Sequence, residues 1–475
     1  MDKKQILKWV FGICGLFLLL NAFFIANEAY WFVLIPVLGF IMLLYITSLD
    51  KILLLIAFLT PLSIELRDRD LGLGISLPVA PLLAGVLLLF IFKIFYDQYY
   101  DGKIFRHPVT IAIIFYLTWV LMTSITSQYP VVSFKFLVAR LWFIIPFYFL
   151  GTQLFKNIKY IKIFCWLYTI SLAIVIIYTT YRHSYFGFSE QVGHWIMDPF
   201  YNDHTAYGAM IAFFMPVIFG FLFDREYSNV QRFLTFLVFS VLFVGLYLSY
   251  CRAAWLGFAA SLVIFFIIKL RIKFKWILFS FISLIIFFFL LKSEIIMKLE
   301  KNRQDTSGKL MQHIESMSNI STDASNLERI NRWTSAFRMF KERPIFGFGP
   351  GTYQFCYAPF QYSYEKTIIS TNAGTKGNAH SEYIGPLAET GVLGSLSVII
   401  IALLVLYTAI KVYNRATDRK VKLLSLLALM GLMTYYIHGF LNNFLDTDKA
   451  AVPFWGFVAI IVALDVYHNK KPETT

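Results

Sequence analysis

The chain has 475 residues, of which 58% are hydrophobic and 15% charged, and its mean hydropathy is +0.66. This composition excludes an ordinary soluble domain and predicts a polytopic, all-α integral membrane protein. The formal net charge of +14 does not indicate nucleic-acid binding, because Lys and Arg lie at the ends of apolar runs rather than on one basic domain.

Apolar runs long enough to cross a hydrocarbon layer, about 20 helical residues each, recur along nearly the whole sequence. We predict about 12–14 transmembrane helices with one large, partly helical loop. N-terminal membrane helices occupy residues 1–292, the loop residues 293–380, and C-terminal membrane helices residues 381–475. In chain order, the candidate helices lie near residues 6–26, 30–48, 51–64, 77–96, 108–126, 134–154, 160–181, 204–223, 232–250, 252–269, 275–292, 383–411, 421–442 and 450–467.

The positions of the basic residues predict the orientation of the chain, because short loops rich in Lys and Arg stay in the cytoplasm. When every apolar run crosses the membrane, the basic loops fall on one side. They include Lys156, Lys159, Lys162, Lys269, Arg271, Lys273, Arg415, Arg419 and Lys420. The opposite, external side then carries two longer loops, residues 182–203 and 293–380.

The first external loop contains His183 and His194, and a third histidine, His204, follows directly after it. Their spacings of 11 and 10 residues fit no compact zinc-ligand pattern. The segment "NDHTAYG" instead predicts the start of a helix that Asn202 or Asp203 caps. We therefore expect His204 to line the path of the acceptor rather than to bind a metal.

The segment "SNLERINRWTSAFRMFKERP" in the second external loop predicts a helix. Ser325 and Glu328 resemble a capping box, and Pro344 ends the run. At about 100° per residue, one stripe of the helix is apolar. The stripe consists of Ile330, Trp333, Phe337 and Phe340. We expect such a helix to lie on the bundle or on the membrane surface, with Arg329 at the edge of the stripe and aimed inward.

The next segment, "PIFGFGPGTYQF", is a glycine-rich turn. It has neither a Walker lysine nor a surrounding βαβ unit, so it is not a nucleotide fingerprint. We interpret it as a flexible bend.

Arg252, Arg329, Arg332 and His380 are all predicted on the external face. Guanidinium groups bind phosphate through paired donors, and a histidine beside them can accept a hydroxyl proton near neutral pH. Together these residues favour phosphoryl-linked chemistry. Taken alone, Arg252 is equally well explained as an arginine that extends to the lipid headgroups.

The ordered set "SYCRAAWLGF", "LERINRWTSAFRMFKERPIFGFGPGTYQF" and "NAHSEYIGPLAETGVLG" resembles the O-antigen ligase and O-antigen polymerase superfamily of bacterial membrane glycosyltransferases. The resemblance covers roughly residues 200–450. It implies an active face on the periplasmic side of the inner membrane, an undecaprenyl-diphosphate-linked glycan as donor, and no metal or other cofactor. The matching catalytic positions are Arg252, Arg329 and His380, and Arg332, one turn further along, competes with Arg329.

In this interpretation the arginines stabilise the charge that develops on the diphosphate leaving group, in place of a metal ion. His380 accepts the proton of the attacking sugar hydroxyl. The N-terminus of the following helix adds a dipole that favours an anion.

Glu382 and Glu389 are seven residues apart, so a helix through both would present them on one face. There one of them could orient His380, contact the substrate or balance an arginine. The alternative is that both are ordinary carboxylates at a solvated helix end, which suits Glu382 better than the deeper Glu389.

Two Asp-x-Asp pairs suggest a different, metal-dependent mechanism, because acidic pairs hold divalent cations in many glycosyltransferases. They are Asp68 with Asp70, and Asp446 with Asp448. We favour the metal-independent mechanism, since Arg67 and Arg69 alternate with the first pair and both pairs resemble ordinary solvated loops.

Three functions are compatible with these patterns. An O-antigen ligase, which we favour, transfers the glycan to lipid A core, whereas an O-antigen or exopolysaccharide polymerase transfers it to another carrier-linked unit. A membrane transporter would do no chemistry, but the chain shows no internal repeat and its distinctive residues gather on one face. The expected partners are the lipid-linked donor, the glycan acceptor and membrane lipids.

Overall fold

The computed structural model describes residues 2–28, 35–68, 73–97, 101–273, 313–367 and 377–468, together with single residues between these ranges. The chain divides into two compact units, Met1–Leu55 and Ile56–Thr475. Within the described residues, nine helices are long and apolar enough to cross a membrane. The predicted all-α membrane architecture is therefore confirmed.

The first unit contains α1 (Lys3–Ala26), α2 (Ile35–Thr47) and the start of α3 (Leu49–Leu59). The ring of Phe32 stacks on Phe24 at 4.4 Å and on Phe17 at 5.5 Å between ring centroids. Most apolar side chains of α1 are exposed, which is the arrangement expected of a helix surrounded by lipid.

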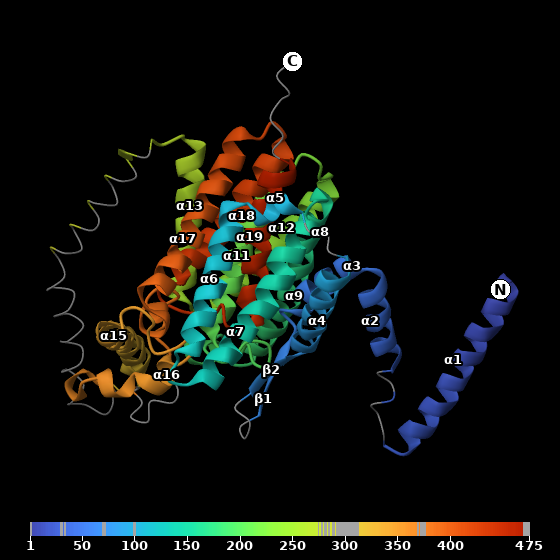
Figure 1. Ribbon diagram of the computed structural model, residues 1–475, viewed down its shortest axis with the longest axis horizontal. Helices are drawn as coiled ribbons and strands as arrows, with labels where there is room; N and C mark the ends of the chain where they lie inside the picture. Colours follow the sequence, from blue (N-terminus) through green and yellow to red (C-terminus); the bar gives the residue numbers. More distant parts are fainter. Residues whose placement is uncertain are drawn as a thin grey trace. The chain divides into compact units, whose positions relative to one another are not determined.

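The second unit contains a bundle of long helices and one short hairpin (Figure 1). Its elements are β1 (Ile64–Asp68), β2 (Leu73–Leu77), α4 (Val79–Asp97), α5 (Gly102–Phe105), α6 (Pro108–Ile125), α7 (Pro130–Ile144), the π-helix η2 (Ile145–Leu150), α8 (Gly151–Leu154), α9 (Ile158–Ser184), α10 (Glu190–Gly193), α11 (His204–Phe221), α12 (Asn229–Leu248), α13 (Arg252–Lys269), α15 (His313–Glu342), α16 (Tyr353–Cys356), η4 (Ala358–Phe360), η5 (Ser363–Glu365), α17 (Gly385–Arg415), α18 (Arg419–His438), α19 (Asp448–Ala463) and η6 (Leu464–His468).

The predicted membrane helices correspond closely to these elements. A helix occupies every predicted run up to residue 269 and every run after residue 383, whereas the run at 275–292 lies mostly outside the described residues. The antiparallel β1–β2 hairpin, in which Ile64 pairs with Leu77, is not predicted from the sequence. It follows α3 directly, at the end of an apolar run that we expect to continue as helix to residue 64.

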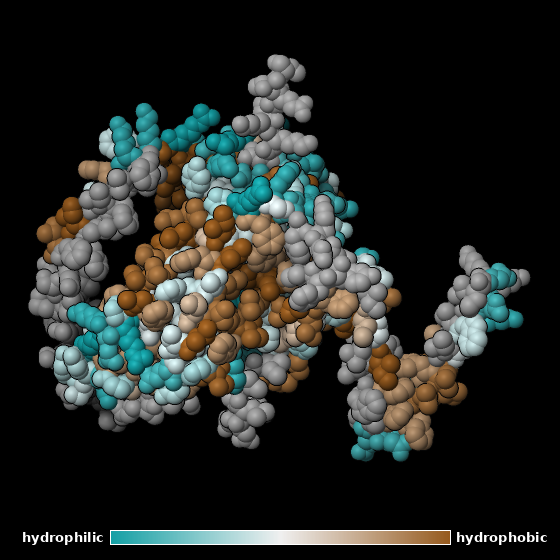
Figure 2. All heavy atoms as spheres, viewed as in Figure 1, coloured by the Kyte–Doolittle hydropathy of each residue, from teal (hydrophilic) through white to brown (hydrophobic). Residues whose placement is uncertain are grey.

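The centre of the bundle is formed by α11, α18 and α19, which bury most of their surfaces. α18 packs against α11, α13, α17 and α19. Few residues of α12 and α13 are fully buried, and Figure 2 shows a broad band of hydrophobic side chains across the bundle with hydrophilic residues at its two ends. This distribution is the one required of a bundle whose outer surface faces lipid.

One end of the bundle carries α15, α16 and the β1–β2 hairpin, and we call it the loop end (Figure 1). α15 begins at His313, so Ser325 lies inside the helix and the predicted capping box does not start it. The predicted end of the helix before Pro344 is confirmed. A Ser-x-x-Glu pattern also fits a helix interior, which is why it fails as a start signal here.

The buried face of α15 is polar over residues 328–335 and apolar beyond them, where Ala336 and Met339 are fully buried. Glu328, Asn331 and Arg332 are buried, whereas Ile330 and Phe337 of the apolar stripe are 40% and 45% exposed. The helix therefore turns hydrogen-bonding side chains toward the protein and leaves part of its apolar stripe outside.

The glycine-rich turn is not the flexible bend expected from its sequence. Gly347, Gly349 and Gly351 all have positive φ, and residues 347–350 are buried. The amide of Phe348 donates to Ala388 O at 3.0 Å, and that of Gly349 donates to Glu389 O at 2.8 Å. Because these bonds join the turn to the first turns of α17, the turn fixes the position of Glu389.

α17 is interrupted at Gly391, whose φ of 69° and ψ of −167° are non-helical. Past the break, the amide of Val392 donates to Pro344 O at 2.9 Å. A Cβ at residue 391 would lie 2.0 Å from Ile345 O. Only glycine satisfies both the backbone conformation and the close approach of the crossing chain.

We expect Gly391→Ala to destabilise the protein by about 2 kcal/mol or more, because alanine is strained in this conformation and clashes with backbone. Thermal unfolding of the purified protein measures the effect. Gly102→Ala is the matched control, since no atom lies within 4 Å of its added Cβ. Equal unfolding temperatures for Gly391→Ala and the unmodified protein would contradict the proposed constraint.

Candidate functional site

His380 lies at the loop end, just before the turn that leads into α17. Its φ of 48° is left-handed, and its amide donates to Asn378 Oδ1 at 3.1 Å. The hydroxyl of Ser381 accepts from the amides of Tyr383 and Ile384 at 3.3 Å each. The left-handed conformation is uncommon for a residue other than glycine, and the turn that contains it precedes α17 directly.

Arg332 is joined directly to the segment that carries His380. Its Nε donates to Glu328 Oε1 at 2.9 Å, and its Nη1 donates to Asn378 O at 3.1 Å. The hydroxyl of Tyr353 donates to Arg332 O at 2.7 Å. Because Arg332 and Glu328 are both buried, this ion pair anchors α15 to the residues preceding His380.

The electrostatic surroundings of His380 favour the neutral imidazole. Burial and the positive charges of Arg332 and Arg329 lower the pKa of His380 to about 4, whereas the carboxylates of Asp203 and Glu328 act in the opposite direction. His380 is therefore neutral near pH 7 and able to accept a proton.

Asp203 caps α11 as the sequence predicts, accepting from the amide of Thr205 at 2.8 Å. Its carboxylate also pairs with Nδ1 of His204 at 3.2 Å. Burial alone would raise the pKa of Asp203, but the hydrogen bonds from His204 and Thr205 outweigh it and lower the pKa to about 2. The rings of His204 and His194 stack with centroids 4.3 Å apart, so His204 is held at the first residue of α11.

Arg252 differs from the other predicted site residues. It is the first residue of α13, its side chain is exposed, and it forms no hydrogen bond or ion pair with the residues that the structure describes. The charge of Arg329 acts both on His380 and on Cys251, the residue next to Arg252. The structure thus brings His380, Arg329 and Arg332 together and leaves the guanidinium of Arg252 accessible.

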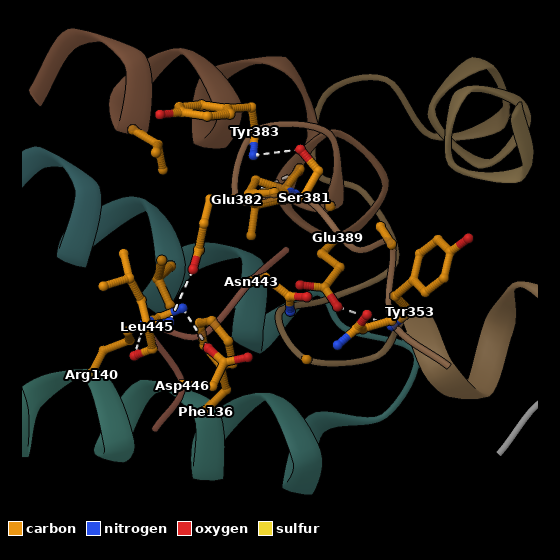
Figure 3. Close-up of a pocket in the computed structure, with 18 of the residues that line it drawn as sticks. Phe136, Arg140, Tyr353, Ser381, Glu382, Tyr383, Glu389, Asn443, Leu445 and Asp446 are labelled. Atoms are coloured by element: carbon orange, nitrogen blue, oxygen red, sulfur yellow. Dashed lines mark hydrogen bonds and ion pairs between the residues drawn. The ribbon is translucent and has the colours of Figure 1, made fainter. Parts of the chain in front are cut away.

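A cavity of about 480 Å³ adjoins this cluster. It is lined by residues of α6, α7, α17, α18 and α19 and by the segment 377–386, although His380 itself is not among them. Figure 3 shows its polar side chains extending toward a common space. They include Arg140, Glu382, Glu389, Asn443 and Asp446.

Glu382 and Glu389 do not share a helical face, because α17 begins at Gly385 and Glu382 precedes it. The carboxylate of Glu382 accepts hydrogen bonds from Tyr435 Oη at 2.7 Å and from the amides of Phe444 and Leu445 at 2.9 Å each. Burial raises the pKa of Glu382, and the charge of Arg140 opposes that rise. Both carboxylates line the cavity, and Glu382 holds the connection between α18 and α19 in place.

Glu389 projects from the first turns of α17. Its Oε1 accepts a hydrogen bond from the amide of Tyr353 at 3.0 Å, which ties the carboxylate to the last part of the glycine-rich turn. Neither glutamate contacts His380 through a hydrogen bond within the described part of the chain, so neither orients the imidazole directly.

Comparison with known families gives a direct result, since residues 236–399 match a family model described as O-Antigen ligase. This segment is similar to the O-antigen ligase and polymerase superfamily. The resemblance found in the sequence is thereby confirmed, and the family implies a lipid-linked glycan and an acceptor as substrates. No curated protein matches the chain.

The match to the O-antigen ligase family contains most of the predicted site residues. His204 and the cavity-lining residues of α7, α18 and α19 lie outside it. The residues inside are Arg252, Arg329, Arg332, His380, Glu382 and Glu389.

Arg140 is not among the site residues predicted from the sequence. It is buried in the middle of α7 and donates to Leu445 O and, at 2.6 Å, to Asp446 Oδ1. An arginine inside an apolar run was the available signal, because ionisable residues within membrane helices are rare and usually paired. Its partner lies 306 residues away, and no local pattern identifies it.

The acidic pair Asp446 and Asp448 does not converge on one point. Asp446 pairs with Arg140, and Asp448 Oδ2 accepts from Ser63 Oγ at 2.7 Å while its Oδ1 accepts the amide of Lys449. Within the described residues, no group of three or more His, Cys, Asp or Glu could hold a metal ion. Asp70 and the side chain of Asp68 lie outside the described residues.

Proposed function

We propose that the protein is a membrane glycosyltransferase that transfers a glycan from an undecaprenyl-diphosphate carrier to an acceptor hydroxyl. The observation that carries the proposal is the neutral His380 held beside Arg329 and Arg332, all within the segment that matches the O-antigen ligase family. Transfer takes place at the loop end, which we assign to the periplasmic face of the bacterial inner membrane. The favoured acceptor is lipid A core, which makes the protein an O-antigen ligase.

In the proposed reaction, His380 accepts the proton of the acceptor hydroxyl as the hydroxyl oxygen attacks the anomeric carbon of the donor sugar. The bond between that carbon and the phosphate oxygen breaks, and undecaprenyl diphosphate leaves with the bonding electron pair. Arginine side chains stabilise the charge that develops on the leaving oxygen. A base positioned in this way typically contributes about 10²- to 10⁴-fold to the rate.

The arginines have different parts in this scheme. Arg332 already binds Glu328 and Asn378, so we assign it to positioning the 378–380 segment and to keeping His380 neutral. Arg329 is the proposed diphosphate ligand from the loop. Arg252 is the proposed ligand from the membrane helices, because an exposed guanidinium at the first turn of α13 is accessible to a lipid-borne anion.

The lipopolysaccharide of a strain lacking the gene tests the proposal. For a ligase we expect lipid A core without any attached polymer, because the last transfer step is absent. A single repeat unit on the core would instead identify a polymerase, the alternative that uses the same residues. Unchanged banding would exclude both an O-antigen ligase and an O-antigen polymerase and would favour an exopolysaccharide polymerase.

We also propose that transfer is independent of a divalent cation, because arginines neutralise the diphosphate. Purified enzyme is expected to keep its activity in excess chelator. Asp68→Asn combined with Asp70→Asn is expected to leave the rate within about twofold, whereas removing a required metal would abolish it. Activity that disappears with chelator and returns with magnesium or manganese would favour the metal-dependent mechanism.

A further inference from the structure

The cavity beside His380 is lined by more carboxyl groups than cations. One guanidinium, that of Arg140, faces the carboxyl groups of Glu382, Glu389 and Asp446. Arg140 already uses two of its donors on Leu445 O and Asp446. An anionic diphosphate would therefore meet a cation that is already paired, whereas a neutral ligand can hydrogen-bond to the carboxyl groups.

Buried polar atoms of the cavity lining lack hydrogen-bond partners within the described chain. They are Nε of Arg140, Oη of Tyr436, Nε1 of Trp455 and Oδ1 of Asn443. Arg140, Tyr436 and Trp455 are only 7%, 8% and 3% exposed. These atoms have almost no accessible surface and lie behind the cavity wall, so the polar groups that can meet a ligand are the side chains that extend into the common space, those of Glu382, Glu389 and Asn443 (Figure 3).

The remaining walls of the cavity are largely aromatic. Tyr116, Phe136, Tyr353 and Phe454 line it together with Trp455. Aromatic faces next to directed donors and carboxylates suit a sugar ring, which has apolar C–H faces and an equator of hydroxyl groups. The volume of about 480 Å³ falls within the range of roughly 300–1,000 Å³ of small-molecule sites.

We propose that this cavity binds a neutral sugar residue next to the reacting centre. Ala379 and Ser381 line the cavity on either side of His380, so a sugar held there lies beside the segment that carries the proposed base. Glu382, Glu389 and Asn443 bind its hydroxyl groups, and the aromatic walls contact its ring. The assignment of that sugar to a transfer substrate rests on the proposed function, but sugar binding itself does not.

Binding is tested on the full-length protein in lipid nanodiscs, with N-acetylglucosamine and methyl glucoside as neutral probes and glucuronate as the charged control. Saturation-transfer NMR is expected to show saturable binding of the neutral sugars and at least tenfold weaker binding of glucuronate. Ala402→Phe, which fills the cavity, and Asn443→Leu, which removes the buried amide, should each weaken neutral-sugar binding at least tenfold. Leu403→Phe is the matched control, because Leu403 is 59% exposed and does not line the cavity.

Neutral sugars that fail to bind, or that bind Ala402→Phe as well as the unmodified protein, would overturn the proposal. So would preferential binding of glucuronate. Each variant is first compared with the unmodified protein in thermal unfolding. If one variant is destabilised, its loss of binding is disregarded and the other variant decides the test.

Kinetics identify the source of the sugar and separate this proposal from the proposed function. A rise in KM for the acceptor alone in Ala402→Phe places an acceptor sugar in the cavity, and a rise for the lipid-linked donor alone places a donor sugar there. Sugar binding by a protein that transfers no glycan would overturn the proposed function and support the site. Normal glycan transfer without sugar binding, together with unchanged KM values in both variants, would support the proposed function and overturn the sugar site.

Discussion

Replacing His380 with alanine is expected to lower the rate of glycan transfer by about 10²- to 10⁴-fold while the lipid-linked donor still binds. The substitution removes the proposed base but leaves the arginines that are proposed to meet the diphosphate. Single-turnover transfer and donor binding, measured on the same purified variant, separate the two effects. His468→Ala is the control, because His468 lies in η6 near the C-terminus and bonds Phe155 O.

The pH dependence of the reaction provides a second check on His380. The proposed base must be neutral, so the rate falls as pH decreases through its pKa. Because burial, Arg332 and Arg329 lower that pKa to about 4, the acid limb of kcat/KM is expected near pH 4. Bound diphosphate offsets the arginine charges, so the acid limb of kcat should lie at higher pH. An acid limb of kcat/KM near pH 6.5 would contradict this account.

A stably accumulated His380→Ala protein that transfers glycan at the normal rate would exclude His380 as the base. Glu382 would then be the next candidate, because burial raises the pKa of its carboxyl group. Its three hydrogen bonds to Tyr435, Phe444 and Leu445 make it a less available base than His380.

Replacing Arg329 or Arg252 with lysine is expected to lower transfer by about 10²-fold or more, although the charge is kept. Lysine is a point charge and cannot supply the paired donors with which a guanidinium binds a phosphate, and loss of one transition-state donor typically costs about 10²- to 10³-fold. Transfer rates and donor affinity at several donor concentrations measure the effect.

Arg338→Lys is the matched control for Arg329→Lys. It changes the same residue type on the same helix, but Arg338 pairs with Glu365 and does not contact the proposed site residues. Equal rates for Arg329→Lys and Arg338→Lys would contradict the assignment of Arg329 to the diphosphate. A normal rate for Arg252→Lys would assign Arg252 to the membrane interface instead.

The sequence predicts the membrane helices well because a hydrocarbon layer imposes the length and apolar character of each one. His380, Arg329 and Arg332 are predicted because they lie in one continuous set of motifs. The cavity is not predicted, because contacts such as that between Arg140 and Asp446 join residues far apart in the chain. The prediction that Glu382 and Glu389 share a helical face is wrong. It assumes one continuous helix, whereas α17 begins at Gly385 and Glu382 lies in the turn before it.

The crossing of the 344–349 segment over the break in α17 has a practical consequence for hybrid proteins. The predicted boundary between loop and membrane helices at residue 380 separates two halves of one interlocked structure, since Pro344 and Gly349 bond Val392 and Glu389. A chimera cut at residue 380 would join a turn from one parent to a helix start from another. Exchanges of the large loop between related enzymes should therefore transfer residues 344–351 and 385–392 as a single block.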